Sequence, residues 1–170
     1  RYLEEPDSRA LYMFPLKALA QDQKRVLSEF YSHVCGGDGD GSTFAAVYDG
    51  DTTPRERTIL RKHPTPVIIT NPDMVHLSML PYHDSWSDFF RALKFIVIDK
   101  IHTYRGLFGA HMSWILRRLI RVAEHYGTRP VFIMLSATVG NPGQLCSKLI
   151  GRDVEVVTEN GAPSGKKHMI

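Results

Sequence analysis

The chain has 170 residues, of which 43% are hydrophobic and 23% are charged, a composition typical of a globular protein rather than of a disordered chain. This length gives room for one ordinary domain. No stretch approaches the roughly 20 apolar residues of a membrane helix, and the N-terminus has no secretory signal layout, so we expect an intracellular protein, cytoplasmic or nuclear. The formal net charge of +3 is compatible with a phosphate-bearing partner but does not require one.

Five short apolar runs alternate with longer amphipathic stretches, a pattern that predicts a parallel sheet with crossover helices. The predicted strands are Ala10–Phe14, Thr43–Val47, Pro66–Thr70, Phe95–Ile98 and Val131–Leu135, with Val154–Val157 as a weaker sixth candidate. Each run is almost continuously apolar, as expected for strands covered by helices on both faces. The sequence therefore predicts an α/β domain over residues 1–159, followed by an exit segment over 160–170.

Polar residues mark the starts of the predicted helices. Thr53, Pro54 and Glu56 predict a capping box with proline at the first helical position. The pairs Asn71-Pro72 and Asn141-Pro142 repeat the arrangement of a capping side chain before a proline.

The longest predicted helix runs from Leu107 to His125. Its apolar stripe, which we expect in the core, consists of Phe108, Met112, Ile115, Leu116, Leu119 and Ala123. Arg117, Arg118 and Arg121 lie elsewhere on this helix, where a solvated face and a binding face are both open interpretations.

Neither the cysteines nor the glycine-rich segment predicts a metal site. Cys35 and Cys146 lie far apart and form no CxxC or CxxH pattern, so we expect buried or idle thiols. The aspartates of segment 36–41 are spaced as in a calcium loop, but Thr43 stands where such a loop needs glycine.

Ligands of open parallel sheets bind outside the carboxyl ends of the strands, so the residues after each apolar run are candidates for function. Asp99, Lys100 and His102 follow the fourth run, and Ser136 and Thr138 follow the fifth. A carboxylate such as Asp99 can hold Mg²⁺ through water while the metal bridges nucleotide phosphates, although an ordinary strand-terminal aspartate is an equal alternative. His102 is available to hydrogen-bond toward a hydroxyl on the next strand.

Two predicted helix starts are candidates for phosphate contacts. Their residues are Lys17, Ala18 and Leu19 after the first run, and Thr70, Asn71 and Asp73 after the third. Helix-start amides, hydroxyls and ammonium groups bind phosphates, and such contacts position a nucleic-acid strand without reading its sequence. Each start can also be an ordinary helix cap.

Taken together and in order, five motifs resemble those of superfamily 2 helicases. They are Pro15–Leu19, Tyr48–Thr52, Thr70–His76, Val97–Tyr104 and Leu135–Thr138. More narrowly, the segments His102–Gly106, Phe108-Gly109 and Arg117–Leu119 resemble the DEAH-type DNA helicases of the mitomycin-repair and RecQ4-like group. The resemblance covers roughly residues 10–151 and is specific because the motifs occur together with compatible spacing.

The resemblance implies a RecA-like P-loop NTPase fold, truncated at the N-terminus, and ATP-dependent 3′ to 5′ DNA translocation with strand separation. Residues 1–159 are then a partial first RecA-like helicase domain whose Walker A loop precedes Arg1. The implied cofactors are ATP and Mg²⁺, in the complete protein. The implied partners are single-stranded or duplex DNA, with RNA still open, and a second RecA-like domain of the same polypeptide.

The same resemblance implies roles for individual residues. Lys17 and the Ala18 and Leu19 amides correspond to the first strand-contacting motif, and Thr70, Asn71 and Asp73 correspond to the second. Asp99 corresponds to the acid that coordinates Mg²⁺ in motif II. His102, Ser136 and Thr138 correspond to the groups that couple ATP hydrolysis to strand movement.

Lys100 departs from the family pattern, which places glutamate at this position to orient the attacking water and accept its proton. A lysine ammonium cannot accept that proton, and it would compete with Mg²⁺ for Asp99. We therefore predict hydrolysis reduced by about 10²- to 10⁴-fold. Glutamate and lysine codons differ by one base, so natural divergence, deliberate inactivation and a sequence error are all open.

A second departure is that no G-x-x-x-x-G-K-[ST] segment occurs, so we expect this chain by itself to bind ATP weakly and to hydrolyse none. The alternative to a helicase fragment is a non-catalytic nucleic-acid-binding module that kept the fold and lost the ATPase. A dinucleotide-binding enzyme is disfavoured because no G-x-G-x-x-G follows any predicted strand.

Overall fold

The computed structural model describes residues 7–15, 17–34, 43–137 and 139–157, and only the backbone of Lys17 and Ala18. Its strands are β1 (Arg9–Met13), β2 (Ala45–Tyr48), β3 (Val67–Thr70), β4 (Leu93–Ile98) and β5 (Val131–Met134). Its α-helices are α1 (Lys17–Val34), α2 (Pro54–Lys62), α3 (Pro72–Met74), α4 (Ser87–Ala92), α5 (Gly106–His125) and α6 (Pro142–Ile150). Short turns of other helix types are η2 (Val75–Met79), η3 (His83–Trp86) and η4 (Ile101–Thr103).

The five strands form one sheet in the order β2-β3-β1-β4-β5, and every neighbouring pair is parallel. The predicted parallel sheet is therefore confirmed, with strand ends within two residues of the prediction. The sixth predicted strand is wrong, because residues 154–157 pair with no described strand. An apolar run needs a neighbouring strand to satisfy its backbone groups before it becomes part of a sheet.

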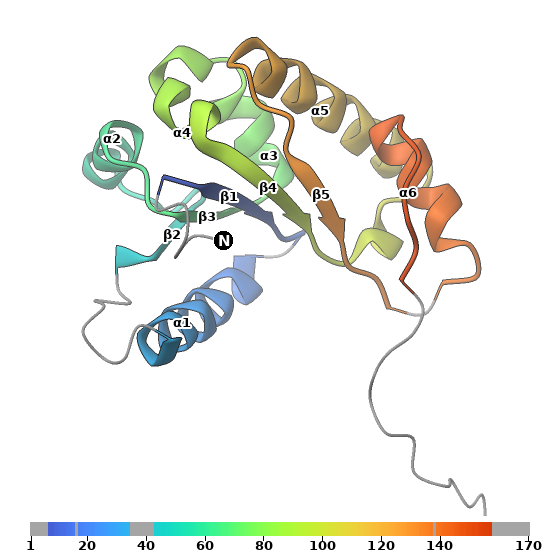
Figure 1. Cartoon of the computed structure of the whole chain (residues 1–170), viewed down its shortest axis with the longest axis horizontal. Coiled ribbons are helices and arrows are strands. Elements are labelled where there is room, and N and C mark those ends of the chain that lie inside the picture. The colour runs from blue at the N-terminus through green and yellow to red at the C-terminus, as the bar shows by residue number, and fades with distance from the viewer. Residues whose placement is uncertain (1–6, 16, 35–42, 138, 158–170) are drawn as a thin grey trace, which may run out of the picture.

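Helices cover both faces of the sheet, but unequally. Figure 1 shows α1 beneath the sheet and α2, α4 and α5 above it. On the α1 side a small apolar cluster contains Phe14, Ala20, Ala45, Val67 and Ile69. A much larger cluster on the opposite side includes Leu11, Ile68, Trp86, Phe89 and Leu116, all of them fully buried.

The edge strand β5 is not covered on both faces. Val131 and Ile133 are 55% and 41% exposed, although they pair in register with Phe95 and Val97 of β4. The expectation of complete coverage on both faces is therefore wrong for β5. Its apolar composition alone did not show which neighbours would be present.

The helix starts follow the prediction in part. The capping box of α2 is confirmed, since the Thr53 hydroxyl accepts from the Glu56 amide and the Glu56 carboxylate accepts from the Thr53 amide. The Asn71 side chain accepts from the Met74 amide, but α3 has only three residues before the π-helical turn η2. Asn141 precedes α6 without a side-chain capping hydrogen bond, so that predicted cap is wrong.

Helix α5 occupies almost the range predicted for it and buries most of its apolar stripe. The exception is Phe108, which is 51% exposed and whose ring lies 5.2 Å from that of Tyr104, measured between ring centroids. Gly109 packs directly against the preceding loop: a β-carbon there would lie 2.4 Å from the Tyr104 carbonyl oxygen. This close approach requires glycine and fixes the loop before α5 against the helix.

Candidate functional site

The carboxyl ends of the strands are joined to one another by hydrogen bonds along one edge of the sheet. The Thr70 hydroxyl donates to the Tyr48 carbonyl at 2.6 Å, and the Phe14 amide donates to the Thr70 carbonyl at 3.0 Å. The Asp99 amide donates to the Met13 carbonyl at 3.0 Å, and the Leu135 amide donates to the Ile98 carbonyl at 2.8 Å. These contacts run across all five strands in their sheet order, so the segments after the strands form one connected edge.

Asp99 and Lys100 form a tightly constrained turn after β4. Among the described residues other than glycine, Lys100 alone has a positive φ, at 54°, a conformation that costs on the order of 1 kcal/mol for such a residue. Its amide donates to the Asp99 carboxylate at 2.8 Å, and its carbonyl accepts from the amide and the hydroxyl of Thr103. These hydrogen bonds hold the strained backbone and fix the Asp99 carboxylate at the end of β4.

The turn that follows Asp99 contacts the segment after β5 at two points. The Ile101 amide donates to the Leu135 carbonyl at 3.0 Å, and the Ala137 amide donates to Nδ1 of His102 at 3.2 Å. The hydrogen bond of His102 is therefore to a backbone amide, whereas the sequence indicated a neighbouring hydroxyl. Ser136 is exposed, and Thr138 lies outside the described residues.

Two tyrosines lie near Asp99, and the pKa of each is raised. Burial is the larger cause for Tyr104, followed by the negative charges of Asp99 and Asp73, and burial with Asp99 raises the pKa of Tyr12. The Tyr104 hydroxyl is buried and has no hydrogen-bond partner among the described residues. The edge around Asp99 is thus partly dry and carries negative charge, conditions under which a cation is favoured.

The residues after β3 divide into buried and exposed members. The Thr70 side chain is 2% exposed and its hydroxyl donates a hydrogen bond to the Tyr48 carbonyl, so it does not fit the direct phosphate contact assigned to it. Thr70 instead joins the ends of β2 and β3. Asn71 caps α3, as an ordinary helix start would, and Asp73 is exposed on the same turn.

The residues after β1 are described only in part. Helix α1 begins at Lys17, so the backbone amides of Lys17, Ala18 and Leu19 lie in its first turn, where amides have no partner within the helix. The Leu19 side chain packs against the cluster beneath the sheet. The Lys17 side chain lies outside what the structure describes, so its predicted phosphate contact stays a prediction.

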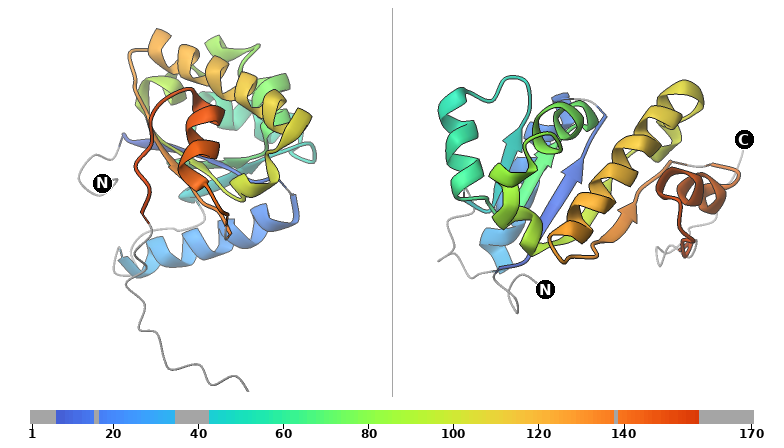
Figure 2. Two further views of the ribbon diagram at one scale, coloured as in Figure 1. Left: turned by 90° about the vertical axis from the view of Figure 1, so that its right-hand side faces the viewer. Right: turned by 90° about the horizontal axis from the view of Figure 1, so that it is seen from above.

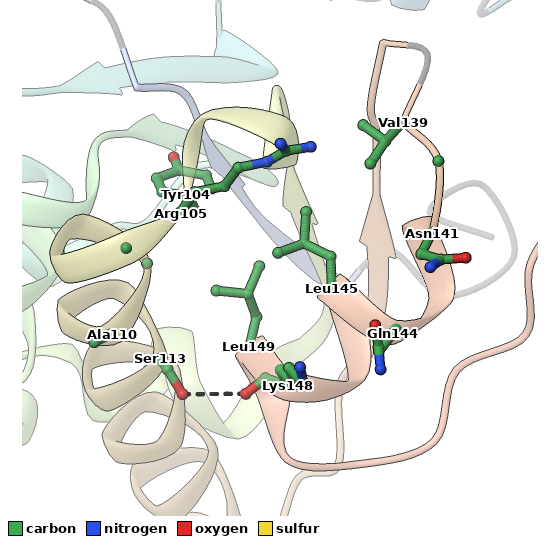
Figure 3. Close-up of a pocket in the computed structure, with 13 residues that line it drawn as sticks. Tyr104, Arg105, Ala110, Ser113, Val139, Asn141, Gln144, Leu145, Lys148 and Leu149 are labelled. Atoms are coloured by element: carbon green, nitrogen blue, oxygen red, sulfur yellow. Dashed lines mark hydrogen bonds between the residues drawn. The ribbon is translucent and has the colours of Figure 1, made fainter.

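A pocket beside this edge was not identified from the sequence. It has a volume of about 590 Å³ and lies between the start of α5 and α6 (Figure 3). Arg105, Gln144 and Lys148 line it together with the apolar side chains Leu145 and Leu149, and the Ser113 hydroxyl donates to the Lys148 carbonyl at 3.3 Å. The two helices that form it are separated by a whole strand in sequence, so sequence spacing alone gave no signal for this pocket.

The sequence matches a known protein family over most of its length. Residues 2–145 match the family model of the DEAD/DEAH box helicases. The chain belongs to this family. Over 167 residues, it is 48% identical to the ATP-dependent helicase YprA of Bacillus subtilis, covering 98% of the chain and 22% of the relative. The identity to the ATP-dependent helicase HRQ1 of Saccharomyces cerevisiae is 42%, with 99% of the chain and 16% of the relative covered.

Solved structures show the same fold. A crystal structure of the helicase MrfA bound to DNA and AMPPNP matches with a TM-score of 0.88 at 47% identity, covering 96% of this chain and 22% of MrfA. The DEAD-box helicase Mss116 matches with a TM-score of 0.68 at 16% identity, a likeness of fold alone. The fold is therefore the RecA-like fold of the helicases. The chain spans about a fifth of the length of the curated relatives named here.

One of the two cysteines lies in the part of the chain that the structure describes. Cys146 is buried, as expected, and burial raises the pKa of its thiol; Cys35 and the segment 36–41 lie outside the described residues. The described helices include none of the length and apolarity needed to cross a lipid bilayer.

Proposed function

We propose that this chain is part of the motor of an ATP-dependent DNA helicase, as a portion of its first RecA-like domain. The observation that carries the proposal is the connected sheet edge, where Asp99 lies beside the contact between His102 and Ala137. MrfA, to which the chain is 47% identical, was crystallised with DNA and AMPPNP, which supports DNA as the strand and ATP as the nucleotide.

The residues at this edge fit a magnesium nucleotide as the ligand. Mg²⁺ is commonly held by one or two carboxylates together with waters and substrate phosphates, and Asp99 offers one carboxylate at the right edge. No three His, Cys, Asp or Glu side chains among the described residues gather to form a metal site of their own, so the nucleotide and water would supply the remaining ligands. When bound, the metal neutralises charge on the phosphates.

We infer that His102 links the turn after β4 to the segment after β5, so that a change in the bound nucleotide would be passed from one to the other. Its hydrogen bond to the Ala137 amide ties the turn after β4 to the segment after β5, which the family resemblance assigns to coupling. A change at Asp99 can reach residues 136–138 by this contact and by the bond from Ile101 to Leu135.

The intact protein would receive its phosphate-binding loop from a segment outside this sequence. Three observations support this proposal. The sequence holds no such loop, the chain spans 22% of MrfA, and the edge strand β5 has an open apolar face at Val131 and Ile133. A second RecA-like domain would complete the nucleotide site, and the chain by itself is expected to bind ATP weakly.

Membership of the family does not by itself mean that the protein hydrolyses ATP, because Lys100 stands where the family has glutamate. Glutamate and lysine both carry a β-carbon, so both meet the same backbone strain at a φ of 54°, and exchanging them should leave the turn unchanged. The exchange therefore alters the chemistry of the site with little effect on its geometry. This makes the position well suited to a test.

The test compares ATP hydrolysis and unwinding by the complete protein as it stands, with Lys100→Glu, and with Lys100→Gln as the matched control that lacks a base. We expect Lys100→Glu to raise the hydrolysis rate by about 10²- to 10⁴-fold and Lys100→Gln to leave it low. Equal rates in the two variants would refute the assignment of position 100 to water activation.

The second candidate function is a non-catalytic nucleic-acid-binding module, and Lys100 is the observation that favours it. Binding of a fluorescent ATP analogue separates the two functions. If none of the three forms binds nucleotide while all bind DNA, the chain belongs to a binding module. If all forms bind nucleotide and glutamate restores turnover, it belongs to a motor.

A further inference from the structure

The outward face of α5 carries a row of basic and aromatic side chains. These side chains recur at helical spacing, and we call them the α5 strip: Trp114, Arg117, Arg118, Arg121 and His125. From Trp114 to His125 the strip is roughly 16 Å long at 1.5 Å per residue. Figure 2 (right) looks onto α5 from above. The sequence alone left these arginines open between a solvated and a binding face.

The positive charge of the strip is largely uncompensated. Arg118 donates to Nδ1 of His76 at 2.7 Å, and Arg117 donates to the Ser113 hydroxyl at 3.3 Å, so neither is neutralised by these hydrogen bonds. Arg121 forms no hydrogen bond or ion pair with any described residue. The acid on this part of α5, Glu124, pairs with Arg152 at 2.8 Å instead.

The strip is also hollowed on both sides of Arg121. One pocket, of about 350 Å³, has Trp114, Arg117, Ile120, Arg121 and Arg152 among its lining residues. The other, of about 280 Å³, is lined by His83, Arg118, Arg121, Val122 and His125. No aspartate or glutamate lines either hollow, although Glu124 pairs with Arg152 of the first and the Asp84 carboxylate lies 3.4 Å from His83 of the second. Arg117, Arg118 and Arg121 pair with no described acid, so each hollow still presents donors to an anion.

Trp114 adds a feature that a merely solvated basic face does not require. Its side chain is 67% exposed, although burying an aromatic ring of this size is strongly favourable. An exposed indole beside guanidinium groups matches the pattern of single-strand binding surfaces, where bases stack on aromatic rings and phosphates meet cations.

We propose that the α5 strip is a second contact surface for single-stranded DNA, separate from the sheet edge. Arg117, Arg118 and Arg121 contact phosphates, and Trp114 stacks on a base. The proposal rests on the proposed helicase function for the identity of its ligand, but it depends on a different part of the surface. A strand reaching the strip would be held outside the motor edge by contacts that do not read its sequence.

The experiment measures the affinity of the complete protein for a fluorescein-labelled oligothymidine of 30 nucleotides, by fluorescence anisotropy over a series of salt concentrations. The variants are Trp114→Ala and the pair Arg117→Gln with Arg121→Gln. The matched controls are Arg55→Gln and Lys62→Gln, which remove exposed cations from α2. A further variant, Lys17→Gln, tests DNA binding at the sheet edge.

The two kinds of variant have different expected signatures. The arginine pair should weaken binding and lower the salt slope by roughly 0.7 for each phosphate that no longer meets a guanidinium group. Trp114→Ala should weaken binding by about five-fold or more with an unchanged slope. An oligonucleotide carrying 5-iodouracil should crosslink to the peptide that contains Trp114.

The proposal is overturned if both α5 variants bind as tightly as the control variants and no crosslink forms at Trp114. In that case weakened binding by Lys17→Gln would show that the helicase function stands and only the strip is wrong. A complete protein that binds no DNA in any form would overturn the strip and the proposed function together.

Discussion

Gly109 offers a sharp test of how α5 holds the loop that carries Asp99. A β-carbon at this position would lie 2.4 Å from the oxygen and 2.8 Å from the carbon of the Tyr104 carbonyl. Ordinary van der Waals contact begins near 3.4 Å, so Gly109→Ala must displace the loop or the first turn of α5 by about 1 Å. Because the obstructing atoms are backbone, no side-chain rotation relieves the contact.

The expected cost can be estimated from opposing contributions. Overpacking of this kind costs about 1 to 3 kcal/mol, whereas alanine in place of glycine within a helix returns about 0.5 to 1 kcal/mol. Because the obstructing atoms are backbone, the overpacking cost should lie in the upper part of its range, at about 2 to 3 kcal/mol, so we expect a net loss of about 1 to 2.5 kcal/mol. At about 2 to 4 °C per kcal/mol for a chain of this size, Tm should fall by about 2 to 10 °C.

The assay is thermal unfolding followed by circular dichroism, with Gly140→Ala as the control. A β-carbon at Gly140 meets no atom within 4 Å, so this variant should melt with the wild type. If Gly109→Ala matched or exceeded the wild type in Tm, helix propensity would outweigh the contact. The reasoning about the loop before α5 would then be refuted.

Three further changes have defined outcomes. Tyr104→Phe removes a buried hydroxyl without a described partner, so urea unfolding should show unchanged or slightly higher stability at pH 7. Since the pKa of Tyr104 is raised in the folded protein, only the unfolded tyrosine gives up its proton just above about pH 10, so the wild type should lose stability there. The variant should lose less stability over the same pH range. A clear loss of stability in the variant at pH 7 would contradict this reasoning. In a Cys35→Ser background, burial should make Cys146 react slowly with a thiol reagent until guanidinium unfolds the chain, and rapid native labelling would refute it. Thr53→Ala should cost about 1 kcal/mol because the helix cap is removed, whereas Thr58→Ala on the same helix should cost less; equal losses would count against the capping box.

The sequence determined the class of the fold because continuous apolar runs and amphipathic stretches have few stable arrangements. Five strands formed where apolar runs were found, and α5 begins one residue before its predicted start. The motifs also placed Asp99 and His102 after the correct strand. Local patterns suffice for these features, since a buried parallel strand and an amphipathic helix each leave a recognisable periodicity.

Other features depended on neighbours that the sequence does not name. The segment 154–157 has a strand's composition but pairs with no described strand, and Val131 stays exposed although its run is apolar. Thr70 follows a strand, as a phosphate-binding hydroxyl would, yet its hydroxyl donates its hydrogen bond to the Tyr48 carbonyl.

The strand order, the left-handed turn at Lys100 and the bond from Ala137 to His102 were likewise settled by tertiary structure alone. So were the surroundings of the arginines on α5, which the sequence could place on a helix but not beside particular partners. Composition and periodicity report which surface of an element is apolar. Which other element meets that surface, and which polar atoms remain available, is decided by contacts between residues far apart in the chain.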